Sequence, residues 1–358
     1  MNRKYVEASV PHYLGFRGEV SDSPLPHERH DSAASLLPGC FIAAICICIW
    51  HDLTAFKALS GIHEAISRSG EIASYACHAL LMFSAGLVCR LEIDRAPDGW
   101  RSSGYLQWLA RVVSMYWISL CLFWCLGIVT SAEMLIGIAC MNELLAQDIL
   151  TLWFVQVIIL FLLLGPLFLQ GSLTRRALGI AAFLSGLALL KLGFKWVDIR
   201  IFELLPAFLV GACFFEFGIL GIILRNRWVL ILALLIFPLC GLSYGKWHDS
   251  TPIASMIRML AMGSGIVLLW RISMSVARRW IPAIIWQGGA SWLGIILLHR
   301  IIAQLAAVSR LDPGFAASWL VLLGVLIPMT VVVAILFHRV FMQARPVDHK
   351  PAAAPAES

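Results

Sequence analysis

Apolar stretches of about 15 to 25 residues recur along the chain from Leu36 onward, separated by short polar segments. A helix of about 20 apolar residues is long enough to cross a lipid bilayer. The pattern therefore predicts an all-α, polytopic membrane protein with about ten transmembrane helices. The predicted spans are residues 36–50, 72–89, 109–131, 150–169, 177–194, 204–223, 228–244, 254–272, 283–308 and 315–338.

The polar segments divide the chain into one membrane domain, residues 36–342, and two tails. Residues 1–35 have no apolar core of the kind that a signal peptide needs, so they are predicted to form a cytoplasmic tail. Residues 343–358 are rich in alanine and proline and are predicted to be a disordered cytoplasmic tail. Residues 132–149 are partly apolar but contain three carboxylates, so we expect a partly inserted outer loop there.

Composition supports the membrane assignment and argues against a soluble protein and against a nucleic-acid-binding protein. Of the 358 residues, 60% are hydrophobic and only 13% are charged, whereas soluble domains average about 25% charged residues. The net charge of +6 comes from scattered lysines and arginines without a basic block, so we expect no nucleic-acid partner. The ten cysteines lie mostly in apolar stretches without metal-ligand spacing, which favours structural roles and no metal site.

The distribution of basic residues predicts the orientation. With the N-terminus inside, seventeen Lys and Arg residues fall in inner segments and seven in outer segments. Because inner loops carry the excess of basic residues, both termini are predicted to be cytoplasmic. We therefore expect a multi-pass protein of the cell inner (plasma) membrane.

Polar side chains within or at the ends of apolar spans are costly, and they mark candidate functional sites. His51 and Asp52 stand at the end of the first span, and Arg111 lies inside the apolar start of the third. Each also has an ordinary structural interpretation, such as an interfacial polar residue or an arginine that reaches the interface. The other candidates are His78, Arg90, Arg101, Trp153 and His299.

In order and content, these segments resemble the acyltransferase-3 family of membrane acyltransferases, which includes fucose-4-O-acetylase-like and polysaccharide O-acetyltransferases. The matching positions are His51, MFSAG at 82–86, the Arg90–Arg111 stretch with RVVSMYW, LWFV at 152–155 and SWLGIILLH at 291–299. The third span departs from the family pattern, because Gln107 and Arg111 stand where two arginines are usual.

The resemblance implies an O-acyltransferase, with acetyl-CoA as the expected acyl donor and no metal. It implies that His51 is the catalytic base, because a neutral imidazole suits proton abstraction near neutral pH. Asp52 and Glu64 are the candidates to orient the His51 ring. Arginine recognises phosphate by bidentate bonds, so basic residues near the inner face are expected to bind the donor. The expected donor-binding residues are Arg90, Arg101 and Arg111, and the expected substrate-binding residues are His78, Trp153 and His299.

The implied acceptor is a hydroxyl of a carbohydrate or lipid-linked glycan, with polysaccharide-synthesis proteins and membrane lipids as expected partners. A multi-span transporter or flippase for a glycan or small solute is the alternative. The spans hold few carboxylates for a proton relay, which weighs against it. A scaffold that retains only the fold is a third interpretation.

Overall fold

The computed structural model describes residues 34–55, 63–95, 103–140, 152–194, 197–214, 216, 218–247, 251–277, 282–308 and 322–342, and within these ranges it contains helices and no strands. The helices are α3 (Leu37–Ala55), α4 (His63–Arg95), α5 (Ser103–Cys125), α6 (Ser131–Ile138), α7 (Leu152–Leu169), α8 (Leu173–Phe194), α9 (Ile199–Ala212), α10 (Gly218–Arg225), α11 (Arg227–Trp247), α12 (Thr251–Ala277), α13 (Ala283–Ala290), α14 (Trp292–Val308) and α16 (Ile327–Met342). A short π-helix, η2 (Leu322–Leu326), runs directly into α16.

The predicted all-α, polytopic membrane architecture is confirmed. In the described part of the chain, seven helices are long and apolar enough to cross a membrane, and the bent pair α13–α14 raises this to eight. The first predicted span is a shorter apolar helix, Leu37–His51. By the length and composition of their helices, the described residues therefore contain fewer than the ten predicted transmembrane spans.

The predicted span at 204–223 is wrong as one continuous helix. Its helix begins earlier, at Ile199, because the Asp198 side chain accepts a hydrogen bond from the backbone N–H of Arg200 and caps the N-terminus. It ends at Ala212, and the chain turns before α10. The turn places the carboxylate of Glu216 2.7 Å from the guanidinium groups of both Arg90 and Arg176. A buried continuous helix would not bring Glu216 to these two arginines.

The predicted span at 283–308 is also broken. Helices α13 and α14 meet at Ser291 with a bend of 86°. Gly288 and Gly289 explain the position of α13, because a Cβ atom at either would overlap the Phe41 ring or the Leu37 carbonyl of α3. The short helix therefore lies against the start of α3, while α14 turns into the bundle.

Part of the predicted outer loop at 132–149 is helical. Helix α6 begins with a capping box, in which Thr130 and Glu133 satisfy each other's backbone N–H groups. It packs on α5, where Tyr116 Oη donates to the carbonyl of Gly137 at 3.0 Å. Residues 141–149, like the tails 1–33 and 343–358, lie outside the described residues.

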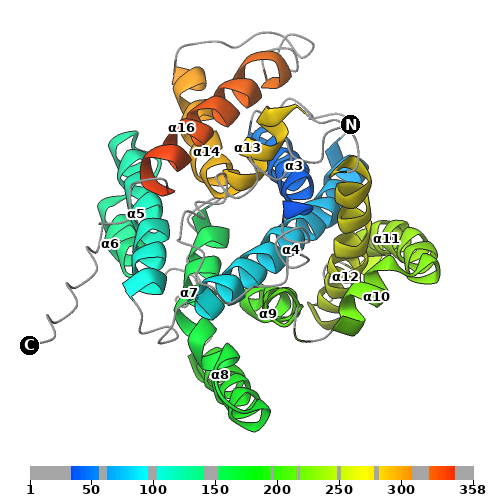
Figure 1. The fold of residues 1–358 in the computed structure, drawn as a ribbon. Coiled ribbons are helices and arrows are strands. Elements are labelled where there is room, and N and C mark those ends of the chain that lie inside the picture. The colour runs from blue at the N-terminus through cyan, green and yellow to red at the C-terminus, as the bar shows by residue number, and fades with distance from the viewer. Residues whose placement is uncertain are drawn as a thin grey trace, which may run out of the picture.

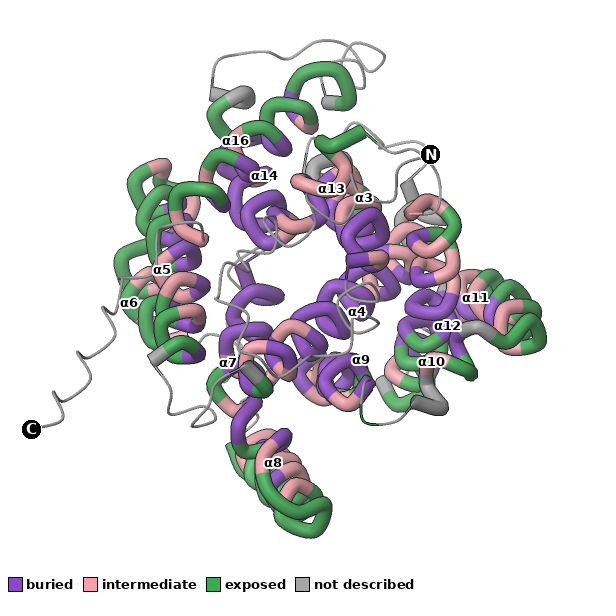
Figure 2. Tube along the Cα trace, in the orientation of Figure 1, coloured by how far each residue is buried: buried purple, intermediate pink, exposed green. Residues whose placement is uncertain are grey.

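Helix α4 is the centre of the bundle (Figure 1), with α3, α7, α9 and α12 packed around it and α14 against α3. In its apolar segment, 83% of the residues are buried, compared with 6% in α8 and 17% in α11. Figure 2 shows this contrast between buried inner helices and exposed outer ones. In a membrane, the apolar outer surfaces of α8 and α11 would face lipid.

The contact between α4 and α9 depends on two glycines. A Cβ atom at Gly86 of α4 would overlap the carbonyl of Phe208, and one at Gly211 of α9 would overlap the carbonyl of Phe83. Small residues at such crossings let helix backbones approach each other closely in membranes. The absence of two side chains thus fixes how α9 lies on α4.

We expect Gly211→Ala to lower stability by about 1–3 kcal/mol, because the added methyl forces the two backbones apart. Gly186→Ala is the matched control, since nothing lies within 4 Å of a Cβ at that helical position. Unfolding in detergent micelles can be followed with a thiol-reactive fluorophore, because the chain's cysteines are free and several are buried. Equal melting temperatures for the two variants would contradict the proposed role of the crossing.

Candidate functional site

Three histidines from distant parts of the sequence meet inside the bundle. The ring centroid of His51, on α3, lies 5.9 Å from that of His78, on α4, and 6.0 Å from that of His299, on α14. His78 and His299 are buried, and His51 is half-buried. The structure therefore brings together all three histidines that the sequence singled out, and we call them the histidine cluster.

The hydrogen bonds of two of these rings define which nitrogen carries the proton. Nδ1 of His78 lies 2.7 Å from the carbonyl oxygen of Ser74, and Nδ1 of His299 lies 2.8 Å from that of Ile296. Since a carbonyl can only accept, each Nδ1 is the donor, and each neutral ring keeps its lone pair on Nε2. Nε2 of His299 is buried and has no hydrogen-bond partner among the described residues.

Trp153, expected to contact substrate, is buried against the cluster. The ring centroid of Trp153 lies 5.2 Å from that of His78. The guanidinium carbon of Arg200 lies 4.1 Å from the ring centroid of Trp153. Such a cation–π contact contributes about 0.5–2 kcal/mol. With His78 on one side and Arg200 on another, Trp153 supports the histidine ring, and little of its surface is left for a substrate.

Arg200 was not identified from the sequence, and its partner is Asp198. The guanidinium donates from Nε to Asp198 Oδ1 at 2.9 Å and from Nη2 to Oδ2 at 2.6 Å. Burial raises the pKa of Asp198, but the hydrogen bonds and charge of Arg200 outweigh this and hold the pKa below its usual range. The sequence signal was an N-cap aspartate two residues before an arginine at a helix start.

A second polar group is buried beside the cluster's helices. Nη2 of Arg258 on α12 donates to Glu203 Oε1 on α9 at 2.6 Å, and its Nε lies 3.0 Å from Oε2. Nη1 of Arg258 also donates to Tyr244 Oη on α11, and Tyr244 donates to Glu71 of α4 at 2.7 Å. This network joins four helices. In the sequence, Arg258 and Glu203 were two isolated charges 55 positions apart with nothing to pair them.

Arg90 and Arg111, two of the arginines expected to bind the donor, lie at the other end of the bundle from the histidine cluster. Arg90 is paired with Asp94 and Glu216 and donates to the carbonyl of Leu169 at the end of α7. Arg111 is half-buried and donates to the carbonyl of Met342 at the end of α16. Arg101 and the side chain of Asp52 lie outside the part that the structure describes.

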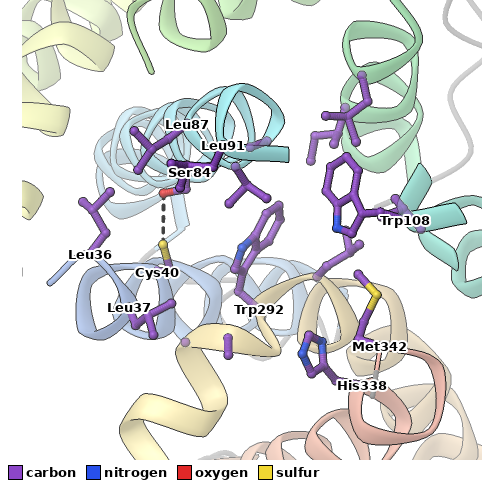
Figure 3. A pocket seen from close by; sticks show the side chains of 18 residues that line it. Leu36, Leu37, Cys40, Ser84, Leu87, Leu91, Trp108, Trp292, His338 and Met342 are labelled. Atoms are coloured by element: carbon purple, nitrogen blue, oxygen red, sulfur yellow. Dashed lines mark hydrogen bonds between the residues drawn. The ribbon is translucent and has the colours of Figure 1, made fainter. Parts of the chain in front are cut away.

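A mainly apolar cavity of about 100 Å³ lies between α3, α4, α5, α7, α13, α14 and α16 (Figure 3). Trp108 and Val112, which flank Arg111 on α5, form part of its wall, as does Met342. Cys40 and Ser84, whose side chains lie 3.0 Å apart, form another part. The cavity therefore occupies the bundle interior near Arg111, on the same helices that carry the histidine cluster.

Among the described side chains, no group of three His, Cys, Asp or Glu residues has the spacing needed to hold a metal ion. The histidine cluster also has Arg200 close to it, and Arg300 follows His299 in α14.

Comparisons of the chain with protein-family models, with curated proteins and with solved structures found no match.

We expect Glu203→Gln to lower stability by about 3 kcal/mol, because it removes the negative charge and leaves the buried guanidinium of Arg258 without a counter-charge. Glu133→Gln, at the partly exposed start of α6, is the control and should cost less than about 1 kcal/mol, because a glutamine at this position can also accept from the backbone N–H of Thr130. Thermal unfolding in the same detergent compares them. A Glu203→Gln variant as stable as the control would show that the ion pair does not stabilise the fold.

Proposed function

We propose that the protein is an integral membrane O-acyltransferase that transfers an acyl group, with acetyl as the expected one, from cytoplasmic acyl-CoA to a hydroxyl of an exported or cell-surface carbohydrate. The observation that carries the proposal is the meeting of His51, His78 and His299. His51 and His299 belong to two separate segments that resemble the acyltransferase-3 family, and His78 lies on the same helix as a third, residues 82–86. A chance resemblance would not require those segments to supply neighbouring side chains.

The chemistry needs a proton acceptor in a site with limited access to water. In the proposed reaction, His51 takes the proton from the acceptor hydroxyl, and the oxygen attacks the thioester carbonyl carbon. Neutral imidazole is suited to this step near pH 7. The surrounding apolar and aromatic side chains, including Trp153 and Phe154, limit water and therefore limit hydrolysis of the donor.

Arg111 is the best candidate for the donor phosphates. Arg90 is already paired with two carboxylates, so a phosphate would have to compete with Glu216 and Asp94. Arg111 donates a hydrogen bond to the neutral carbonyl of Met342 and stands beside the apolar cavity. The cavity is smaller than the engineered cavity of about 150 Å³ that binds benzene, so it suits a thin chain such as the arm of the donor better than a ring system.

The proposal requires the arginine end of the bundle to face the cytoplasm. Reporter fusions after Gly171 and after Arg345 are expected to report a cytoplasmic location, and a fusion within residues 132–149 a location outside. The basic residues of the inner segments are the physical reason. A C-terminus outside the cytoplasm would contradict both the orientation and the use of a cytoplasmic donor.

We expect His51→Ala to abolish acylation of the host's exported glycans, with a loss of about 10²–10⁴ in rate, because a general base is removed. Mass spectrometry of the glycans from cells with the wild-type gene, without it, or with the variant measures the effect. Cys121→Ala, at an exposed position on α5, is the control for expression and insertion.

Wild-type acylation by a well-inserted His51→Ala protein would exclude His51 as the base. A change in glycan or solute export without any change in acylation would instead favour the transporter or flippase.

A further inference from the structure

We infer that His299 is the residue that positions His51 and stabilises it when it becomes protonated, so that the two histidines act as a catalytic dyad. This inference rests on the proposed function and adds a role that Asp52 was expected to fill. His51 contacts the reacting hydroxyl, and His299 acts through His51.

The geometry of His299 is that of a fixed hydrogen-bond acceptor. Its Nδ1 donates to the carbonyl of Ile296 at 2.8 Å, which holds the ring in one tautomer and orientation. Its Nε2 carries the lone pair, is buried, and has no partner among the described residues. A buried acceptor left unpaired destabilises the fold, and such atoms often mark a functional site.

The imidazole ring of His51 lies beside that of His299. The two ring centroids are 6.0 Å apart and the rings are nearly perpendicular, at 85°. An N–H···N bond of about 2.9 Å would need the rings roughly 1 Å closer. Catalytic hydrogen bonds are often long without substrate and shorten in the reacting complex.

The reaction creates the need for this acceptor. The acceptor O–H bond breaks as its proton moves to His51, and a C–O bond forms between that oxygen and the thioester carbonyl carbon. The C–S bond then breaks, and the CoA sulfur leaves with the proton that His51 held. Between these steps His51 is an imidazolium ion, whose second N–H can donate to Nε2 of His299.

Asp52 directly follows His51 in the chain, and its side chain lies outside the part that the structure describes. A base is usually held by a group from another element, as His299 on α14 would hold His51 on α3.

His78 is the internal control, because it has the same tautomer and a similar distance to His51. Its surroundings differ: its ring contacts both Trp153, at 5.2 Å, and Phe154, at 4.5 Å. These contacts favour a packing role for His78.

Two variants separate positioning from structure. Asn places its amide nitrogen near the position of Nδ1, so His299→Asn can keep the bond to Ile296 but lacks the acceptor at Nε2. Gln places a carbonyl near the position of Nε2, so His299→Gln can accept from His51 but loses the bond to Ile296. We expect kcat to fall about 100-fold in His299→Asn and less than about 10-fold in His299→Gln, with KM for acyl-CoA and for the acceptor unchanged in both.

The measurement is acyl transfer by the purified full-length protein in detergent or liposomes, with the glycan acceptor of the host and acetyl-CoA. The His51→Ala/His299→Asn double variant should be no slower than His51→Ala, because the two residues act as a unit. His78→Asn and His78→Gln should not differ in kcat by more than about threefold.

A structural role for His299 predicts the reverse order, with Asn better than Gln, and that result would overturn the inference while leaving the proposed function intact. Equal kcat values for wild type and His299→Asn would overturn it as well. Failure of the wild-type protein to acylate any glycan would overturn the proposed function and the dyad together.

Discussion

The crossing of α4 and α9 is the contact on which the rest of the structure depends. Gly86 and Gly211 let each helix backbone touch the other, and no larger residue fits at either position. Helix α9 carries Arg200 toward Trp153 and Glu203 toward Arg258, while α4 carries His78. A shift of α9 on α4 would therefore disturb the support of the histidine cluster and the buried ion pair at the same time.

The buried polar groups form two networks, which differ in whether their hydrogen bonds are complete. Arg258 and Glu203 satisfy each other, and Tyr244 extends the network to Glu71, so this system is complete without a ligand. The histidine cluster is incomplete, because Nε2 of His299 lacks a partner among the described residues. Completed networks favour one rigid arrangement, whereas an unpaired acceptor is a place where a further group can bind.

The sequence predicted the membrane class, most of the helices and the histidines, because apolar length and isolated polar residues are local signals. It did not predict the breaks at Ser291 and after Ala212. Those depend on Gly289 meeting the backbone of α3 and on Glu216 meeting two arginines, contacts between segments far apart in the chain.

The same limit applies to the site. His51, His78 and His299 could be nominated one by one, but their convergence depends on the packing of three helices. In the sequence, Arg200 and Arg258 are ordinary charged residues. Only the position of α9 places Arg200 over the Trp153 ring and brings Glu203 to Arg258.

The length of the apolar part of α3 bears on the acceptor that the proposed acyltransferase would use. From Leu37 to His51 there are fifteen residues, which rise about 22 Å, while the hydrocarbon core of a bilayer is about 30 Å thick. If Leu37 stood at one edge of that core, the His51 ring would lie several ångströms inside the other edge, and the helix would continue beyond it to Ala55. In the proposed reaction, a free oligosaccharide in bulk water would then have to leave its hydration shell to reach His51, whereas a sugar carried on a lipid would be delivered to the interface by its own anchor.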